Sequence, residues 1–113
     1  MKLHYSSCPI SVATNRKLKS VIAATDSKVE EVTYKGGDDI SKLSAFNTLP
    51  LLETPEGTIF SSNAIARYLA STNKKELYGN GNIYCQGLID QFLDFATFEL
   101  EPAVRGVSKH QHG

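Results

Sequence analysis

The segment 49–69 constrains the fold of this chain more than any other part of the sequence. Two short apolar runs, Leu51–Glu53 and Thr58–Phe60, flank the turn residues Thr54–Gly57. Proline presets φ at the second position of such a turn, and glycine tolerates the exit geometry at the fourth. These residues therefore predict two antiparallel strands joined by a tight turn, with the Glu53 side chain facing solvent.

A helix is predicted directly after these strands. Apolar residues from Ala64 to Leu69 recur at helical spacing, and Ser62 stands where the helix is expected to begin. Serine caps a helix by accepting a backbone N–H. The free amides and partial positive charge of a helix start also suit a carboxylate. Ser62 is therefore both a candidate cap and a candidate ligand-binding residue, and the two roles are compatible.

The first part of the chain predicts a strand, a helix and a second strand. The strand covers Lys2–Tyr5, the helix runs from Val12 to about Ala24, and the second strand covers Lys28–Tyr34. A flexible loop over 36–39 and at most a short helix over 40–45 follow. The βαβ unit implies parallel strands and the later turn implies an antiparallel hairpin, so the order βαβ–ββα predicts a thioredoxin-like α/β domain.

A second unit is expected after residue 72. Residues 73–81 are polar and glycine-containing, which is typical of a linker, and Asn82 can cap a helix that runs to about Leu100. This helix is apolar on several sides. One stripe holds Ile89, Phe92, Leu93, Ala96 and Leu100, and Leu88, Phe95 and Phe98 widen it. Such a helix would expose a large apolar patch if it stood alone.

Composition excludes several functional classes. The chain has 12 basic and 12 acidic residues, which argues against a general electrostatic grip on nucleic acid or an anionic membrane. No signal peptide or membrane-spanning run is visible, and with two cysteines a structural disulfide is not expected. We therefore expect a cytoplasmic protein. No metal-ligand cluster is present in the sequence, and the two histidines of the C-terminal tail are expected to be solvated.

Two motifs resemble the glutathione-binding half of the glutathione transferase family. They are Leu49-Pro50 and Ser61-Ser-Asn-Ala-Ile65. Ser62–Ala66 followed by Tyr68, together with Arg16-x-x-Lys-x-x-Ile-Ala-Ala24, is most like the transferase-like domain of translation elongation factor 1-gamma. The resemblance implies a thioredoxin-like domain over 1–72, a linker over 73–81, and the start of an all-helical C-terminal domain over 82–113.

The resemblance also implies glutathione contacts. Leu49 would pair its backbone with the cysteinyl part of glutathione, Pro50 would be cis, and Ser62 would hold the γ-glutamyl carboxylate. Ser61 stands where active members have Glu or Gln to pair with the ligand's ammonium, and Thr48 stands where they often have Lys or Gln. Each loss removes a contact worth roughly 1–3 kcal/mol, so we expect weak glutathione binding.

In this family a hydroxyl or thiol after the first strand lowers the pKa of the glutathione thiol. The candidates here are Tyr5, Ser6 or Ser7, Cys8 and Ser11. Ser11 is the best placed serine, although it could instead simply cap the first helix. Cys8-Pro-Ile-Ser11 resembles the Cys-Pro-x-Ser of monothiol glutaredoxins and cysteine-type transferases, although a lone Cys-Pro is a weak signal and favours an ordinary loop cysteine.

Three functions follow from the resemblance. The first is an interaction module of the translation elongation factor 1 complex that anchors the nucleotide-exchange subunit. The second is a serine-type glutathione transferase acting on hydrophobic electrophiles, and the third is a Cys8-based thiol transferase. The implied partners are other elongation factor 1 subunits or a transferase-like chain in a dimer or larger complex. No cofactor is expected, with glutathione as the possible ligand. The second domain would be incomplete, either in a fragment or in a short form that buries its helix against a partner.

Overall fold

The computed structural model describes residues 1–8, 11–35 and 48–97. In chain order, the elements are β1 (Lys2–Ser6), α1 (Val12–Ala24), β2 (Glu30–Tyr34), β3 (Leu51–Thr54), β4 (Gly57–Phe60), α2 (Ser62–Asn73), the 3₁₀ helix η2 (Lys75–Gly81) and α3 (Ile83–Phe95). The predicted strands and first helix agree with these bounds to within two residues. The loop predicted over 36–39 and the short helix predicted over 40–45 lie outside the described residues.

The four strands form one mixed sheet in the order β2-β1-β3-β4. β1 pairs with β2 in parallel, whereas the β1–β3 and β3–β4 pairs are antiparallel. The Thr54 side chain closes the predicted turn, because its hydroxyl accepts the Gly57 N–H at 3.1 Å and donates to the Gly57 carbonyl at 2.7 Å. The thioredoxin-like order is therefore confirmed.

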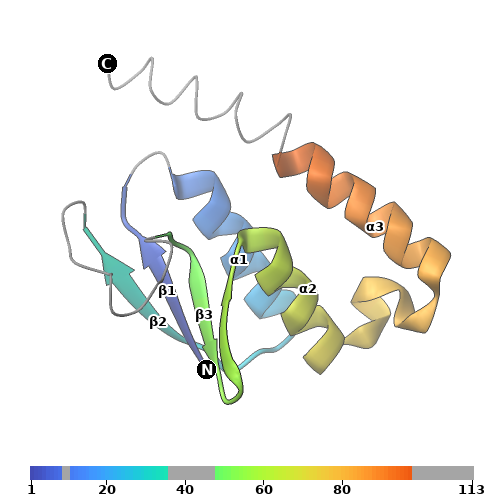
Figure 1. Ribbon diagram of the computed structural model, residues 1–113, viewed down its shortest axis with the longest axis horizontal. Coiled ribbons are helices and arrows are strands. Elements are labelled where there is room, and N and C mark those ends of the chain that lie inside the picture. Colours follow the sequence, from blue (N-terminus) through green and yellow to red (C-terminus); the bar gives the residue numbers. More distant parts are fainter. Residues whose placement is uncertain (9–10, 36–47, 98–113) are drawn as a thin grey trace.

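The core lies between one face of the sheet and the helices α1 and α2, which Figure 1 shows on the same side of the strands. Leu3 and Leu52 face each other across β1 and β3. Leu18 of α1 and Ile65 and Leu69 of α2 pack against them. Strand side chains alternate between the two faces of a sheet, and side chains three or four residues apart share one face of a helix. The apolar residues at these spacings therefore form one face on the sheet and one on each helix, and these faces pack together.

The opposite face of the sheet carries a polar network that the sequence did not predict. His4 is 5% exposed. Its Nδ1 lies 2.8 Å from the Tyr34 hydroxyl, and its Nε2 lies 2.8 Å from Glu53 Oε1. His4 of β1 pairs with Val32 of β2 and with Leu51 of β3. Tyr34 and Glu53 each stand two residues after one of these partners, so all three side chains lie on the same face of the sheet. The expectation that Glu53 simply faces solvent is wrong, since its carboxylate binds this buried ring.

The segment predicted as a linker contains helical turns. α2 continues through Asn73, and η2 then leads into α3. Gly79 has φ +78°, and a Cβ there would approach the backbone nitrogen of Gln86 to 2.9 Å, so only glycine fits. Asn82 caps α3 as predicted, because its side chain accepts the Cys85 N–H at 3.0 Å. The predicted end of this helix near Leu100 lies outside the described residues.

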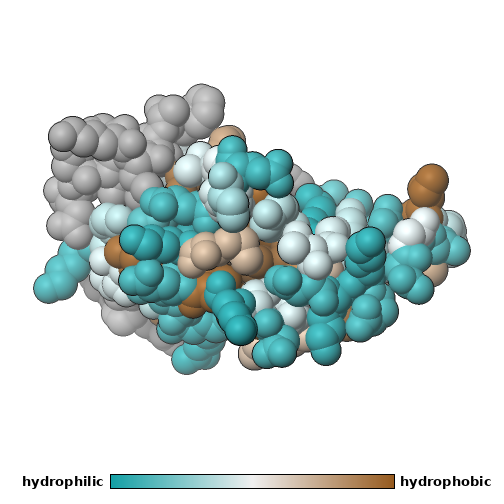
Figure 2. Space-filling model, turned by 90° about the horizontal axis from the view of Figure 1, so that it is seen from below, coloured by the Kyte–Doolittle hydropathy of each residue, from teal (hydrophilic) through white to brown (hydrophobic). Residues whose placement is uncertain are grey.

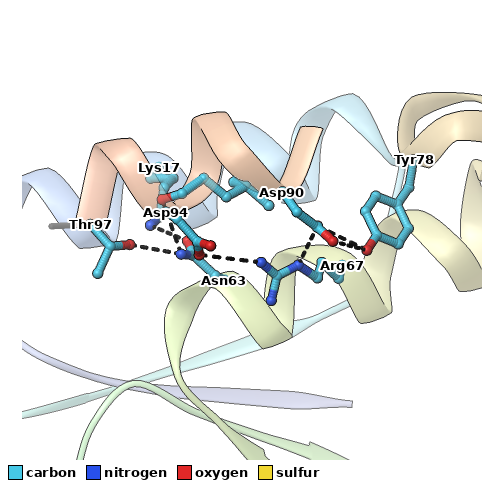
Figure 3. Close-up of polar contacts among 8 residues, drawn as sticks. Lys17, Asn63, Arg67, Tyr78, Asp90, Asp94 and Thr97 are labelled. Carbon is cyan, nitrogen blue, oxygen red and sulfur yellow. Dashed lines mark hydrogen bonds and ion pairs between the residues drawn. The ribbon is translucent and has the colours of Figure 1, made fainter. Parts of the chain in front are cut away.

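Asn63 fastens α3 to the thioredoxin-like unit. Its amide oxygen accepts a hydrogen bond from Lys17 Nζ of α1 at 2.8 Å. Its amide nitrogen donates to the Leu93 carbonyl at 3.1 Å and to Thr97 Oγ1 at 2.7 Å (Figure 3). One side chain at the start of α2 therefore connects α1, α2 and the C-terminal helix.

A second polar group lies further along the same interface. Arg67 Nε of α2 donates to Asp90 Oδ1 at 2.8 Å, and Arg67 Nη2 lies 3.7 Å from Asp94 Oδ1. The Tyr78 hydroxyl of η2 lies 2.9 and 3.1 Å from the two oxygens of Asp90 (Figure 3). Arg67 therefore has a structural role here, since it connects α2 to α3.

We expect stability to fall at alkaline pH in part through Tyr78. Desolvation, together with the hydrogen bond to Asp90, raises the pKa of the Tyr78 phenol above its ordinary value of 10.0. The folded chain thus holds this proton more tightly than the unfolded chain, so the contribution is complete below pH about 10 and is lost as the pH rises through the folded-state pKa. Tyr78→Phe should make denaturant-measured stability decline less steeply between pH 9 and 12. An equally steep decline would contradict this role, and Tyr68→Phe is the matched control.

α3 leaves a row of apolar side chains uncovered, as the sequence predicted. Ile83 is 84% exposed, Tyr84 75% and Phe92 67%. Leu88 and Phe95 continue this surface, which we call the α3 face. Figure 2 shows apolar side chains projecting at the end of the molecule where η2 meets α3. One detail differs from prediction: Ile89 and Leu93 turn toward the other helices, whereas Phe92 points away from them.

Candidate functional site

A small hollow lies where the end of β1 meets the start of α1 and the residues before β3. Its volume is about 30 Å³, and it is lined by Ser6, Ser11, Thr14, Asn15, Leu49 and Pro50. The Leu49–Pro50 peptide bond is cis, as predicted. The fold therefore brings together four of the predicted site residues, Ser6, Ser11, Leu49 and Pro50, from two segments that lie far apart in the sequence.

Backbone and side-chain hydrogen bonds shape this hollow. Asn15 Nδ2 donates to the Ser6 carbonyl at 2.7 Å and so connects α1 to the end of β1. The Cys8 N–H donates to Ser6 Oγ at 3.1 Å, and the Ser11 N–H donates to the Cys8 carbonyl at 2.9 Å. Ser11 occupies the N-cap position of α1, but its hydroxyl makes no capping hydrogen bond. The interpretation of Ser11 as a plain side-chain cap is therefore not supported.

Two of the candidate nucleophiles, Tyr5 and Cys8, lie outside this hollow. Tyr5 packs against the hydrophobic core, and Lys19 Nζ lies 5.4 Å from the centre of its ring. Cys8 is a free, half-buried cysteine whose side chain is not among those lining the hollow. Of the predicted candidates after the first strand, Ser6 and Ser11 line the hollow formed by the described residues, whereas Tyr5, Ser7 and Cys8 do not.

The start of α2 differs from prediction. Ser62 is the first helical residue and Ser61 holds the N-cap position, so the assignment of Ser62 as the cap is wrong. Ser61 makes no side-chain capping bond, and its carbonyl accepts the Ile65 N–H at 3.0 Å. Its backbone has φ +80° and ψ 125°, a conformation rare for any residue but glycine. Neither serine lines the 30 Å³ hollow.

Replacing Ser61 with glycine should stabilise the chain. A non-glycine residue at positive φ stores of order 1–3 kcal/mol, and glycine removes this strain at the cost of extra freedom in the unfolded chain. We expect the free energy of unfolding to rise by about 1 kcal/mol, as measured by urea denaturation. Ser61→Ala is the control, since it keeps the strain and should leave stability nearly unchanged. A destabilised Ser61→Gly variant would show that this backbone is not strained.

Sequence reasoning missed two lining residues, Thr14 and Asn15. A usable signal was present, because Ser11, Thr14 and Asn15 stand three and four residues apart and so share one face of a helix. Together they offer hydroxyl and amide groups that can hydrogen-bond a peptide or hold a thiolate. The 30 Å³ hollow has room for about one water molecule.

The lining side chains of this hollow are all uncharged. Within residues 1–8, 11–35 and 48–97, no group of three or more His, Cys, Asp or Glu side chains is placed to hold a metal ion. In the same part of the chain, none of the helices has the length and apolar character needed to span a bilayer.

Comparison with known proteins gives matches of two kinds. The chain is 36% identical over 92 residues to probable elongation factor 1-gamma 2 of Arabidopsis thaliana, covering 74% of this chain and 22% of that protein. It is 35% identical over 57 residues to glutathione S-transferase 4 of Zea mays, covering 50% of this chain and 26% of that protein. Elongation factor 1-gamma chains from rice, cherry and Trypanosoma cruzi also match.

Among solved structures, glutathione S-transferase isozyme E7 of Drosophila melanogaster superposes with a TM-score of 0.71 at 26% identity. The alignment covers 86% of this chain and 46% of that one. The chain thus spans less than half the length of this structure and about a quarter or less of the two relatives described above. Residues 1–71 match the family model of the glutathione S-transferase N-terminal domain, so the chain belongs to the glutathione S-transferase N-terminal domain family.

Proposed function

We propose that this chain is a glutathione-transferase-like interaction module of the translation elongation factor 1 complex. In this role it resembles the gamma subunit and anchors the nucleotide-exchange subunit through surface contacts. It acts in the cytoplasm together with other elongation factor 1 subunits and needs no cofactor. The observation that carries the proposal is the 36% identity to a protein named elongation factor 1-gamma over 92 residues, which reach past the thioredoxin-like unit.

The lack of charged groups for glutathione supports the interaction module. The lining of the candidate site is uncharged, and Ser61, in place of the Glu or Gln expected for glutathione binding, offers no carboxylate or long amide to an ammonium group. A hydroxyl in place of a carboxylate weakens recognition of a charged group, because charge-assisted hydrogen bonds are roughly twice as strong as neutral ones. A domain that no longer has to hold glutathione tightly can keep the fold and lose these groups.

The α3 face supports the same conclusion. Exposed, contiguous apolar side chains are a feature of protein–protein interfaces, and aromatic residues supply most of the binding energy there. Tyr84, Phe92 and Phe95 stand on this face at half exposure or more. We therefore propose that the nucleotide-exchange subunit binds to α3.

Isothermal titration of this chain with the purified nucleotide-exchange subunit of elongation factor 1 tests the proposal. We expect saturable binding, weakened at least tenfold by Phe92→Asp. Phe60→Asp is the matched control, because Phe60 is also about half exposed but lies on β4, and it should bind like the wild type. No heat from a chain shown to be folded would overturn the proposed function. An equal loss of binding affinity in both variants would contradict the assignment of the contact to α3.

A second candidate is a serine-type glutathione transferase, and the hollow at Ser11 favours it. The Ser11 hydroxyl lies beside the cis Leu49–Pro50 bond without serving the helix cap, so it could donate to a glutathione thiolate there. Titration with glutathione separates the two candidates. Micromolar binding that Ser62→Ala abolishes would favour the enzyme, whereas no heat up to several millimolar would favour the interaction module.

A further inference from the structure

A second hollow, of about 150 Å³, lies where α3 faces the C-terminal half of α1 and the middle of α2. We call it the interhelical hollow. Its walls include Val21, Ala24, Ala70, Leu77, Ile89 and Leu93. It is distinct from the Ser11 hollow, because α1 runs between the two and its 13 residues span roughly 18 Å.

Two features of the chain keep the interhelical hollow open. The wall formed by α1 and α2 includes the short side chains of Ala24, Ala66 and Ala70, which do not reach across to α3. The polar contacts of Asn63 at one end and of Arg67 with Asp90 at the other hold α3 at a fixed distance (Figure 3). Closer packing of α3 would break these hydrogen bonds, so the space is not removed by a small shift of the helix.

The chemistry of the walls defines what can enter. A water molecule needs two to four polar partners. Thr25, Arg67 and Tyr78 also line the hollow, but their polar groups are already bound to Val21 and Asp90, and the other lining side chains are aliphatic, so water is held poorly there. Apolar cavities of about this size in proteins stay dry and accept benzene or xenon. Arg67 is the charged residue among the lining side chains, and its guanidinium is already paired with Asp90 and Asp94, so it is not available to an anion.

We propose that the interhelical hollow is a binding site for a small neutral apolar molecule about the size of benzene. The site is separate from glutathione recognition and does not depend on the proposed function. Partial burial of one ring against Ala70, Ile89 and Leu93 supplies the binding free energy, since removing apolar surface from water is favourable and roughly proportional to area.

Fluorine NMR titration with fluorobenzene, which is neutral and of the right size, tests this site. We expect millimolar, saturable binding to the wild-type chain. Ala70→Leu fills the hollow and should weaken binding at least tenfold. Ala23→Leu is the matched control on an exposed position of α1, and it should bind like the wild type. No binding up to the solubility of the probe, or unchanged binding by a folded Ala70→Leu variant, would overturn the proposal.

A second measurement on the wild-type chain removes any dependence on the folding of the variant. Intermolecular nuclear Overhauser effects from the probe should reach the methyl groups of Ile89 and Leu93. Contacts confined to Phe92 and Phe95 would place the probe on the α3 face instead and overturn the proposal. Sedimentation of the same samples shows whether a second copy of the chain covers the hollow. Absence of probe binding in such a dimer would count against the site.

Discussion

Replacing Asn63 with alanine should lower the free energy of unfolding by about 3 kcal/mol. Asn63 is 8% exposed and makes three hydrogen bonds, one of them to the Lys17 ammonium group. A neutral hydrogen bond contributes about 1 kcal/mol and one to a charged group about 2 kcal/mol, while water entering the gap recovers part of the loss. Urea denaturation measures the change, and hydrogen exchange should show α3 amides losing protection more than those of β1 and β3.

Two variants make this experiment specific. Asn63→Asp keeps an oxygen acceptor for Lys17 and places a negative charge in the first turn of α2, but it loses both N–H donors to α3. It should therefore cost less, about 1–2 kcal/mol. Asn73→Ala removes an exposed asparagine with one hydrogen bond, to Ser27, and should cost under 1 kcal/mol. If α3 amides in Asn63→Ala exchange no faster than in the wild type, Asn63 does not anchor this helix.

The local elements were predictable because their signals lie within a few residues. The turn at Thr54–Gly57 follows from proline and glycine at fixed positions, and the α1 bounds follow from apolar spacing. The sheet order followed from two rules, that a βαβ unit pairs in parallel and that a tight turn pairs its strands antiparallel. Pro50 was expected to be cis from family resemblance, and it is.

The contacts between elements were not predictable in this way. Asn63 was read only as part of a binding motif, yet its partners Lys17, Leu93 and Thr97 are 30 to 46 residues away. The positive φ of Ser61 moves the cap one residue earlier than expected, and no glycine marks the position. Side-chain spacing indicates which residues share one face of a helix or strand, but it does not indicate which other element that face contacts.

The orientation of α3 shows the same limit. Periodicity placed Phe92 on one stripe with Ile89 and Leu93, and because the helix is apolar on several sides, several rotations about its axis satisfy that pattern. The hydrogen bonds of Arg67 with Asp90 and of Asn63 with the Leu93 carbonyl select one rotation. Phe92 is then directed outward at 67% exposure. Polar contacts, and not apolar content, therefore decide which aromatic side chains this surface offers to a partner.

Replacing His4 with alanine should destabilise the sheet by about 3 kcal/mol. The ring is buried, connects three strands and makes hydrogen bonds at both nitrogens. A carboxylate only accepts hydrogen bonds, so Nε2–H donates to Glu53, and in the neutral ring Nδ1 accepts from the Tyr34 hydroxyl. Alanine leaves a cavity and removes both bonds at once, which costs more than either loss alone. Thermal and urea denaturation measure the change.

Tyr34→Phe and Glu53→Gln show whether the network acts as a unit. Tyr34→Phe removes one hydroxyl and keeps the ring, so it should cost about 1 kcal/mol, and Glu53→Gln keeps a neutral acceptor and should cost less. Contacting residues couple, so His4→Ala combined with Tyr34→Phe should cost about 1 kcal/mol less than the sum of the two single changes. Strict additivity would mean that the Tyr34 hydroxyl contributes nothing through His4. In that case the contribution of the network would come from the His4–Glu53 contact, between β1 and β3.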